Sequence, residues 1–305
     1  MKKRPDQRGG AGEGRGAARR ENTRRGEAGE RPTHWGEVAD WYDALVGDEG
    51  SEYHREVIMP GVLRMLGLGR GERREMRILD LACGQGVLAR KLAGIEGVHV
   101  TGIDGAATLI AAAERRNAQD RLPIHYLLAD ATKLLGEDGT PAGGLERGSF
   151  DAITIVLAIQ NISPLSPVWQ GCRALLKPEG KLLLVMMHPC FRIPQRSDWW
   201  WEDGPNGGTQ SRLVRQYLTS AQIAIQTHPG RAAHGKGTPE TTHFHRSLQA
   251  YVNTLGNAGL LIDHLEEWIS HKKSQPGPRK EALDAARREI PMFLALRARA
   301  VSRDE

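Results

Sequence analysis

Two close glycines separate an apolar run from a helical pattern in residues 77–91. This order predicts a strand, a glycine turn and a helix, which is how a nucleotide-binding α/β sheet begins. Gly84 and Gly86 allow a ligand to approach the backbone, which a side chain would prevent. The free N–H groups at the start of the helix favour an anionic ligand group. Asp80, at the end of the strand, would repel a pyrophosphate and suits a ligand with a cationic amino group.

Asp104 and Asp130 end the next two apolar runs, 98–104 and 124–130. Asp104 follows Gly84 by 20 residues, and a carboxylate at that position can accept hydrogen bonds from both hydroxyls of a ribose. Asp130 has a simpler alternative, because a carboxylate at a strand end is a common helix N-cap. We favour a binding role for Asp130 because it is the third acid in the series.

The run Asp80-Leu-Ala-Cys-Gly-Gln-Gly86, taken with Asp104, resembles motifs I and II of the class I S-adenosylmethionine-dependent methyltransferases. The run Leu-Leu-Lys-Pro-Glu-Gly-Lys-Leu-Leu-Leu (175–184) is similar to a sequence characteristic of the same family. A nicotinamide or flavin enzyme is the alternative, since Gly84-x-Gly86-x-x-Ala89 also satisfies the dinucleotide fingerprint.

The resemblance implies S-adenosyl-L-methionine as the cofactor. Asp130 would accept from the adenine amino group, and the backbone of Ala131 would receive the ring edge. Tyr42, in the run Asp-Trp-Tyr-Asp (40–43), would lie near the methionine end of the cofactor, with packing on the sheet as the alternative. The predicted cofactor-binding residues are Tyr42, Asp80, Ala82, Cys83, Gly84, Gly86, Asp104, Gly105, Ala106, Asp130, Ala131 and Leu157.

Methyl transfer is an in-line displacement at an activated carbon, so the protein mainly has to align the reacting atoms. A hydroxyl acceptor also has to lose its proton, for which histidine is the usual base. His188, directly after the fifth expected strand, is the first candidate for that base, and His228 is a lower one. Asn161, at the exit of the fourth strand, is a candidate for orienting a substrate hydroxyl. The alternatives are a buried histidine bonded to the backbone for His188 and a helix cap for Asn161.

The exit of the fourth strand also bears on the acceptor. Enzymes that methylate amines of nucleobases or glutamine carry Asn/Asp-Pro-Pro-aromatic there, whereas this sequence has Ala158-Ile-Gln-Asn161. We therefore predict a methyltransferase that acts on a small organic acceptor, at oxygen. The alternatives are an RNA methyltransferase whose basic N-terminal tail contacts phosphates and a non-catalytic module that binds the cofactor.

Strand and helix patterns alternate through residues 77–187, which predicts an α/β fold with a parallel sheet and helices on both faces. The resemblance covers residues 35–187 and 243–300. It implies a seven-stranded, mostly parallel sheet whose last strand is antiparallel. Other expected elements are a turn at 177–180, a helix at 244–258 with Val252 inward, a strand at 260–268, a helix at 279–288 and a strand at 290–298.

Composition sets apart a basic tail (1–31), which we expect to be disordered, and an insertion (190–242). The resemblance implies helices that cover the cofactor (32–76), a Rossmann-like core (77–189) and the C-terminal part of the core sheet (243–305). We expect the insertion to be a substrate lid. Within the insertion, 213–218 and 221–227 are expected to pair as a hairpin. Its three tryptophans, 199–201, would form either a stacking wall for a planar substrate or an anchor for the lid.

Charge and cysteine content limit the other function classes. Residues 1–31 hold ten Lys or Arg and five Asp or Glu, a net +5 that equals the formal net charge of the whole chain. The rest is therefore close to neutral, which weakens the case for a nucleic-acid-binding core. The three scattered cysteines indicate neither a disulfide framework nor a metal site. We therefore expect the protein to lie in a reducing cytoplasm. No apolar run approaches the roughly 18 residues of a membrane helix, and the oligomeric state stays open.

Overall fold

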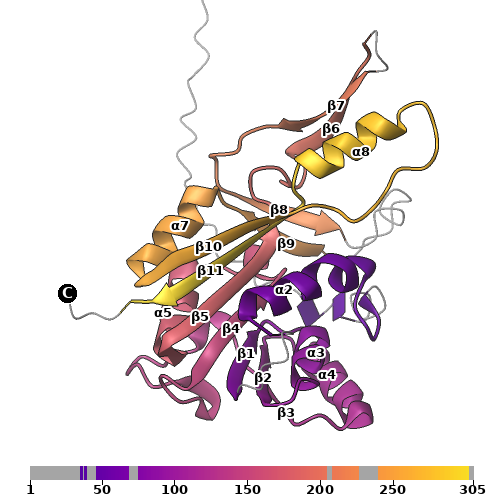
Figure 1. The fold of residues 1–305 in the computed structure, drawn as a ribbon. Helices are drawn as coiled ribbons and strands as arrows, with labels where there is room; N and C mark the ends of the chain where they lie inside the picture. The colour runs from indigo at the N-terminus through magenta and orange to yellow at the C-terminus, as the bar shows by residue number, and fades with distance from the viewer. Residues whose placement is uncertain are drawn as a thin grey trace, which may run out of the picture. The chain divides into compact units, whose positions relative to one another are not determined.

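Seven strands form one mixed sheet in the order β10-β11-β5-β4-β1-β2-β3 (Figure 1). The computed structural model describes residues 35–36, 38–39, 46–68, 75–204, 208–226 and 240–301. The strands of the sheet are β1 (Met76–Leu81), β2 (Val98–Asp104), β3 (Ile124–Leu128), β4 (Phe150–Val156), β5 (Leu176–Met187), β10 (Leu260–Trp268) and β11 (Phe293–Ala300). The helices are α2 (Met59–Leu66), α3 (Val87–Ala93), α4 (Ala107–Asp120), α5 (Leu165–Leu175), α7 (Leu248–Asn257) and α8 (Lys280–Glu289), with the short turns η1 (His54–Ile58), η2 (Ala131–Lys133), η3 (Ala142–Gly144) and η4 (Ile159–Asn161).

The first five strands are parallel, and β11 runs antiparallel to both of its neighbours, β5 and β10. The predicted α/β fold with an antiparallel last strand is therefore confirmed. Parallel strands end at the same edge of a sheet, so β1, β2 and β3 bring their closing acids to one edge. No helix within the described ranges is both long and apolar enough to cross a membrane.

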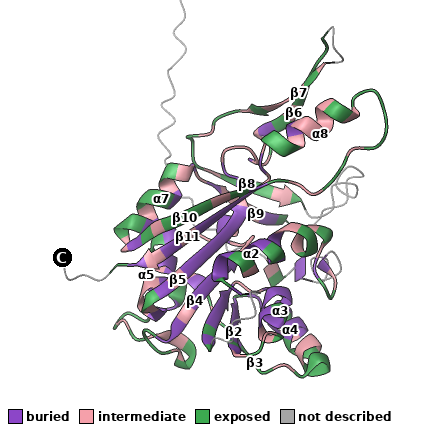
Figure 2. Cartoon of the chain, viewed as in Figure 1, coloured by how far each residue is buried: buried purple, intermediate pink, exposed green. Residues whose placement is uncertain are grey.

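Alternate residues of each strand point to opposite faces, and each face builds its own core. On one face, Leu79 and Leu81 pack with Trp169 of α5 and Tyr251 of α7. On the other, Ile78 packs against apolar side chains of α2, α3 and α4. Figure 2 shows the central strands buried between these helices. Asp80 has the parity of Ile78, so it faces the side of α2 and α3.

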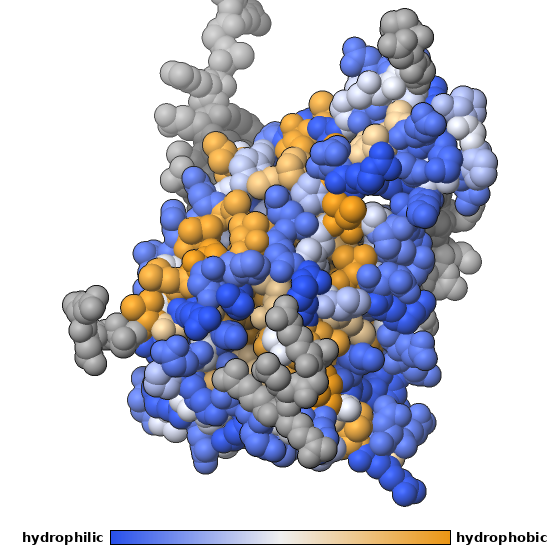
Figure 3. Space-filling model, in the orientation of Figure 1, coloured by the Kyte–Doolittle hydropathy of each residue, from blue (hydrophilic) through white to orange (hydrophobic). Residues whose placement is uncertain are grey.

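The outer edge of the sheet is more apolar than most of the surface. Figure 3 shows hydrophobic groups gathered over the region of β10, whose exposed large side chains include Leu261 and Leu265. This edge lies at the far end of the sheet from β3, so it takes no part in placing the acids.

The insertion forms two hairpins, and the predicted pairing of 213–218 with 221–227 is wrong. β6 (Ser197–Glu202) pairs with β7 (Thr209–Val214), and β8 (Ala221–Gln226) pairs with β9 (Glu240–His245), both antiparallel. Arg196 donates to the carbonyls of Gln216 and Thr219 and holds the connection between β7 and β8 open as a loop. β7 and β8 therefore do not pair with each other: β7 pairs with β6, and β8 pairs with β9.

Three further expectations need correction. The expected turn at 177–180 lies inside β5 as a bulge, because pairing with β4 resumes beyond it at Lys181. The helix expected from 244 begins at Leu248, since β9 occupies the residues before it. Val252 is 41% exposed, so it lies on the outer face of α7.

Candidate cofactor and active site

The glycine loop after β1 closes tightly on Tyr126 of β3, two strands away in the sheet. Ala82, Gly84 and Gly86 have positive φ angles of 58°, 56° and 77°. A Cβ on Gly86 would lie 2.2 Å from the Tyr126 hydroxyl of β3, so both conformation and space require glycine there. Ala82 holds the same backbone region without being glycine, a strain that is typical of ligand sites.

Asp104 uses both carboxylate oxygens to join this loop to β2. The N–H of Gly84 donates to Oδ2 over 2.9 Å, and the N–H of Ala106 donates to Oδ1 over 2.8 Å. Asp104 is 9% exposed. Burial raises its pKa, although both backbone hydrogen bonds oppose the rise. Each carboxylate oxygen can accept a further hydrogen bond, so Asp104 keeps acceptor capacity for a ligand hydroxyl.

Asp80 has a buried carboxylate oxygen that no described residue satisfies. Oδ1 accepts from Thr154 Oγ1 of β4 over 2.9 Å, whereas Oδ2 has no partner. Burial raises the pKa of Asp80 to about 7; the Thr154 hydrogen bond opposes the rise and the charge of Asp104 adds to it. A buried acceptor without a partner is costly. The amino group of S-adenosyl-L-methionine fits this environment, because an ammonium would satisfy Oδ2 and favour the charged carboxylate.

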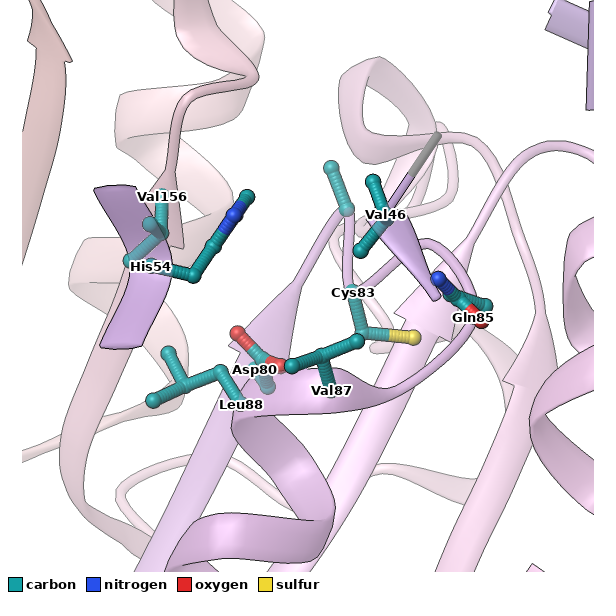
Figure 4. A pocket seen from close by; sticks show the side chains of 9 residues that line it. Val46, His54, Asp80, Cys83, Gln85, Val87, Leu88 and Val156 are labelled. Carbon is teal, nitrogen blue, oxygen red and sulfur yellow. The ribbon is translucent and has the colours of Figure 1, made fainter. Parts of the chain in front are cut away.

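Asp80 faces a cavity of ≈30 Å³ between the sheet edge and residues 46–58, which we call the cover (Figure 4). The walls come from β1 and the glycine loop, from the end of β4 and from the cover. The lining residues are Val46, His54, Asp80, Ala82, Cys83, Gln85, Val87, Leu88 and Val156. This volume holds one or two water molecules, so the cavity has room only for a small group beside Asp80.

Arg90 of α3 fastens the cover to the glycine loop. Its side chain is 8% exposed and donates to the carbonyls of Gln85 and Asp48, each over 2.7 Å. Gln85 Nε2 donates to the carbonyl of Gly47 over 3.1 Å, and Arg116 pairs with the Asp48 carboxylate at 2.7 Å. Residues 47–48 are therefore held against the loop that would contact the cofactor.

Asp130 is exposed and caps the short turn η2. Its Oδ1 accepts from both the N–H and the hydroxyl of Thr132, each over 2.8 Å. Oδ2 is used by no described residue. The following residue, Ala131, is buried and packs in the core on the α5 face. The N-cap is thus present, and it leaves one carboxylate oxygen for a ligand.

Leu157 continues the cavity edge after β4 in a left-handed conformation, with φ of 55°. Its N–H donates to the Val185 carbonyl, and its own carbonyl accepts from Gln160 Nε2, both over 2.7 Å.

Cys83 is half-buried, and burial raises the pKa of its thiol. Gly105 is open, because a Cβ there would meet only the Ala129 carbonyl, at 3.9 Å.

The ring of His188 is 2% exposed, and both of its nitrogens are engaged. Nδ1 accepts from the N–H of Cys190 over 3.2 Å, which places the ring proton on Nε2, 2.7 Å from Glu267 Oε1. Burial lowers the pKa of His188, and Glu267 opposes that shift. The geometry therefore favours the alternative role, a buried histidine that fixes the end of β5, over that of a base.

Asn161 also has a structural contact. Its Nδ2 donates to the Thr242 carbonyl over 2.8 Å and so ties β9 to the sheet edge. The predicted contacts of Tyr42 and His228 lie outside the described residues. The structure therefore brings together the glycine loop, Asp80, Asp104, Asp130 and Leu157 at one edge.

His54 and Thr154 belong to this edge, although the sequence did not single them out. Thr154 lies two residues before the end of β4, where its polar side chain in an apolar strand was the available signal. His54 lies in η1, within the cover, and comes 26 residues before Asp80. No local pattern marks it, because only the fold brings the cover over β1.

The tryptophans of β6 serve mainly as anchors. Trp199 lies under the guanidinium groups of Arg192 and Arg212, at 5.0 and 5.1 Å from its ring centroid. Trp201 lies 4.4 Å from the guanidinium of Arg279, beside α8. Trp200 remains 59% exposed, so it alone could stack on a ligand.

Comparison with known proteins points to one family. A family model for the methyltransferase domain matches residues 78–180. The ubiquinone biosynthesis O-methyltransferase of Xanthomonas axonopodis pv. citri (strain 306) is 29% identical over 148 residues, which are 48% of this chain and 56% of that protein. The protein of the same name from Xylella fastidiosa (strain 9a5c) is 32% identical over 108 residues, 35% of this chain and 40% of its own. The chain thus spans about half the length of the curated relatives it matches.

Solved structures extend the similarity to most of the chain. An S-adenosylmethionine dependent methyltransferase from Mesorhizobium loti matches with a TM-score of 0.57 and 25% identity, covering 80% of this chain and 99% of that one. The CcbJ methyltransferase from Streptomyces caelestis shares the fold, with a TM-score of 0.53, 18% identity, and coverage of 88% and 99%. Because the matched domain, the strand order and this structural similarity agree, residues 78–180 carry a methyltransferase domain within the fold of the class I S-adenosylmethionine-dependent methyltransferases, whose cofactor is S-adenosyl-L-methionine.

Proposed function

We propose that this protein transfers a methyl group from S-adenosyl-L-methionine to an oxygen atom of a small organic acceptor. The observation that carries the proposal is the buried Oδ2 of Asp80, an acceptor with no partner among the described residues, in a cavity beside the glycine loop. Such an atom suits the cationic amino group of this cofactor and would repel the pyrophosphate of a dinucleotide.

The other two acids would hold the nucleoside. Asp104 would accept the ribose hydroxyls with the capacity left after its bonds to Gly84 and Ala106. Asp130 would accept the adenine amino group through Oδ2, because Oδ1 is taken by Thr132. The remaining proposed contacts would be made by Tyr42, Ala82, Cys83, Gly84, Gly86, Gly105, Ala106, Ala131 and Leu157. The bound cofactor supplies a methyl group already activated by the sulfonium charge, so the chain mainly aligns the acceptor and excludes water.

The acceptor would enter at the exits of β4 and β5, beneath the insertion. There β9 lies against η4, and Asn161 holds the two together through Thr242. We assign the insertion, 190–242, the role of a substrate lid on this ground. Two observations support an oxygen acceptor. The matching relatives are named O-methyltransferases. The β4 exit, 158–161, lacks the Asn/Asp-Pro-Pro-aromatic run of enzymes that methylate amines of nucleobases or glutamine.

Calorimetric titration with S-adenosylhomocysteine and with NAD tests the cofactor site. We expect S-adenosylhomocysteine to bind and NAD not to bind. Asp80→Asn should weaken S-adenosylhomocysteine binding by about 1–3 kcal/mol, because it removes a charge-assisted hydrogen bond. Asp138→Asn, in an exposed loop, is the matched control and should bind as the wild type does. Binding of NAD in place of S-adenosylhomocysteine would overturn the proposal.

The acceptor class is tested with a methyl-labelled cofactor, using phenols and RNA as acceptors. The full chain is compared with a chain that lacks residues 1–31, the basic segment. Transfer to phenols by both proteins supports the proposal. Salt-sensitive transfer to RNA that disappears with the deletion would favour the RNA methyltransferase.

A further inference from the structure

His54 places its ring in the same cavity as Asp80. It comes from η1, the π-helical turn that precedes α2. Figure 4 shows the ring on the side of Val156, at the end of β4, with Asp80 and the glycine loop forming other sides of the cavity. Ligands of parallel α/β sheets bind beyond the carboxyl ends of the strands. His54 therefore adjoins the place where the methyl group and its acceptor would meet.

The ring is held in one orientation. Its Nδ1 lies 2.8 Å from Ser51 Oγ. A Cβ on Gly50 would lie 2.8 Å from the Cβ of His54, so a glycine at 50 lets the chain close against this histidine. Nε2 has no hydrogen-bond partner among the described residues, in contrast to His188, whose two ring nitrogens are both engaged.

Burial favours the neutral form of the His54 ring, because it lowers the pKa of this histidine. The titratable groups that share its cavity are Asp80 and Cys83, and burial raises the pKa of both. A neutral imidazole is the form that can accept a proton at neutral pH.

We propose that Nε2 of His54 receives the proton of the acceptor hydroxyl, an inference that rests on the proposed function. The acceptor oxygen forms a bond to the methyl carbon as the carbon–sulfur bond breaks and its electron pair passes to sulfur. The hydroxyl proton passes to Nε2 and later leaves to solvent. Ser51 is the positioning residue, because its Oγ accepts from Nδ1–H and leaves the lone pair of the ring on Nε2.

A different role for His54 would require the opposite tautomer. To bind the carboxylate in the methionine part of the cofactor, a neutral ring would have to donate through Nε2–H and accept from the Ser51 hydroxyl at Nδ1. A proton acceptor needs Nδ1–H and a free Nε2. The position of one proton therefore separates a base from a cofactor ligand.

Nitrogen-15 NMR of the full chain bound to S-adenosylhomocysteine reads this tautomer directly. The His54 signals are assigned by their loss in His54→Gln. We expect Nδ1 to carry the proton and Nε2 to be unprotonated at neutral pH. A ring protonated at Nε2, or at both nitrogens, would overturn the proposal. This measurement does not depend on turnover.

Kinetics with catechol as the probe acceptor provide a second test. His54→Gln should lower kcat by about 100- to 10,000-fold, remove the acid limb of the kcat–pH profile and leave the affinity for S-adenosylhomocysteine unchanged. Ser51→Ala should lower kcat less, because the imidazole of His54 remains and only loses the contact that orients it. His99→Gln is the control, since His99 is exposed on β2 and pairs with Glu75 at 2.9 Å.

The outcomes separate this inference from the proposed function. Turnover of His54→Gln equal to that of His99→Gln would overturn the inference, as would a loss of S-adenosylhomocysteine affinity with normal turnover at saturating cofactor. Failure of the wild type to bind S-adenosylhomocysteine would instead remove the proposed function itself.

Discussion

The backbone N–H of Gly84 donates to Oδ2 of Asp104 over 2.9 Å, so the loop after β1 is held in shape by the acid that ends β2. The other oxygen of the same carboxylate accepts from Ala106 at the start of α4. The carboxylate that would bind the ribose therefore also builds the loop beside it. A change at Asp104 should affect both binding and folding.

Asp104→Ala should weaken binding of S-adenosylhomocysteine by about 1–3 kcal/mol, from the loss of charge-assisted hydrogen bonds. It should also lower the free energy of unfolding, because the N–H groups of Gly84 and Ala106 lose their acceptor. Asp104→Asn should recover only part of either loss, since its NH₂ group must face one of these two donors. Calorimetry and denaturant titration measure the two effects, and an unchanged dissociation constant would refute the ribose assignment.

Gly86→Ala should destabilise the fold by about 1–3 kcal/mol, through its left-handed φ and its clash with Tyr126. Tyr126→Phe removes the hydroxyl that would lie 2.2 Å from the new Cβ. A double-mutant cycle in denaturant should therefore show a smaller loss for Gly86→Ala in the Tyr126→Phe background. Equal losses in both backgrounds would assign the whole effect to the backbone.

Asp80 should make stability depend on pH in the direction opposite to that of a salt-bridged acid. Its pKa is raised from 3.8 to about 7 in the folded state, so the folded chain binds the proton more tightly than the unfolded chain does. The contribution to the free energy of unfolding is full below the unfolded pKa and falls as pH rises toward 7. Asp80→Asn should remove this fall and be the more stable protein above pH 7, although it binds S-adenosylhomocysteine more weakly.

Unfolding of the wild type and of Asp80→Asn at pH values on either side of 7 measures this dependence. Binding of a cationic amino group favours the carboxylate, so the affinity of the wild type for S-adenosylhomocysteine should rise as pH increases through 7. Parallel pH profiles for the two proteins would show that another group is responsible.

His188→Gln should lower stability while leaving the chemistry in place. The change disturbs the contacts of the ring with Glu267 and with the N–H of Cys190, at a cost of about 1–3 kcal/mol for buried hydrogen-bonding groups. Thermal unfolding should shift downward, and turnover of catechol per folded molecule should stay near the wild-type value. A collapse of turnover at unchanged stability would restore His188 as the base.

The sequence by itself determined the parts of the fold whose signals are local. β2 and β10 begin and end at the expected residues, 98–104 and 260–268, because runs bounded by turn residues fix a strand with little outside help. The glycine loop, and the acid at or near the end of each of the first three strands, could equally be predicted from local sequence. Parallel strands end at one edge, so the strand order already placed Asp80, Asp104 and Asp130 together.

Tertiary structure decided what depends on contacts between distant segments. In the insertion, each hairpin joins strands that are separated by a loop. The apolar pattern of 213–218 could therefore not predict which strand these residues pair with. His188 and His54 are both single histidines in sequence. Packing against Glu267 engages the ring of His188, and closure of the cover over β1 brings His54 to Asp80. Burial and hydrogen-bond partners set the chemistry of a side chain, and both arise only when the chain has folded.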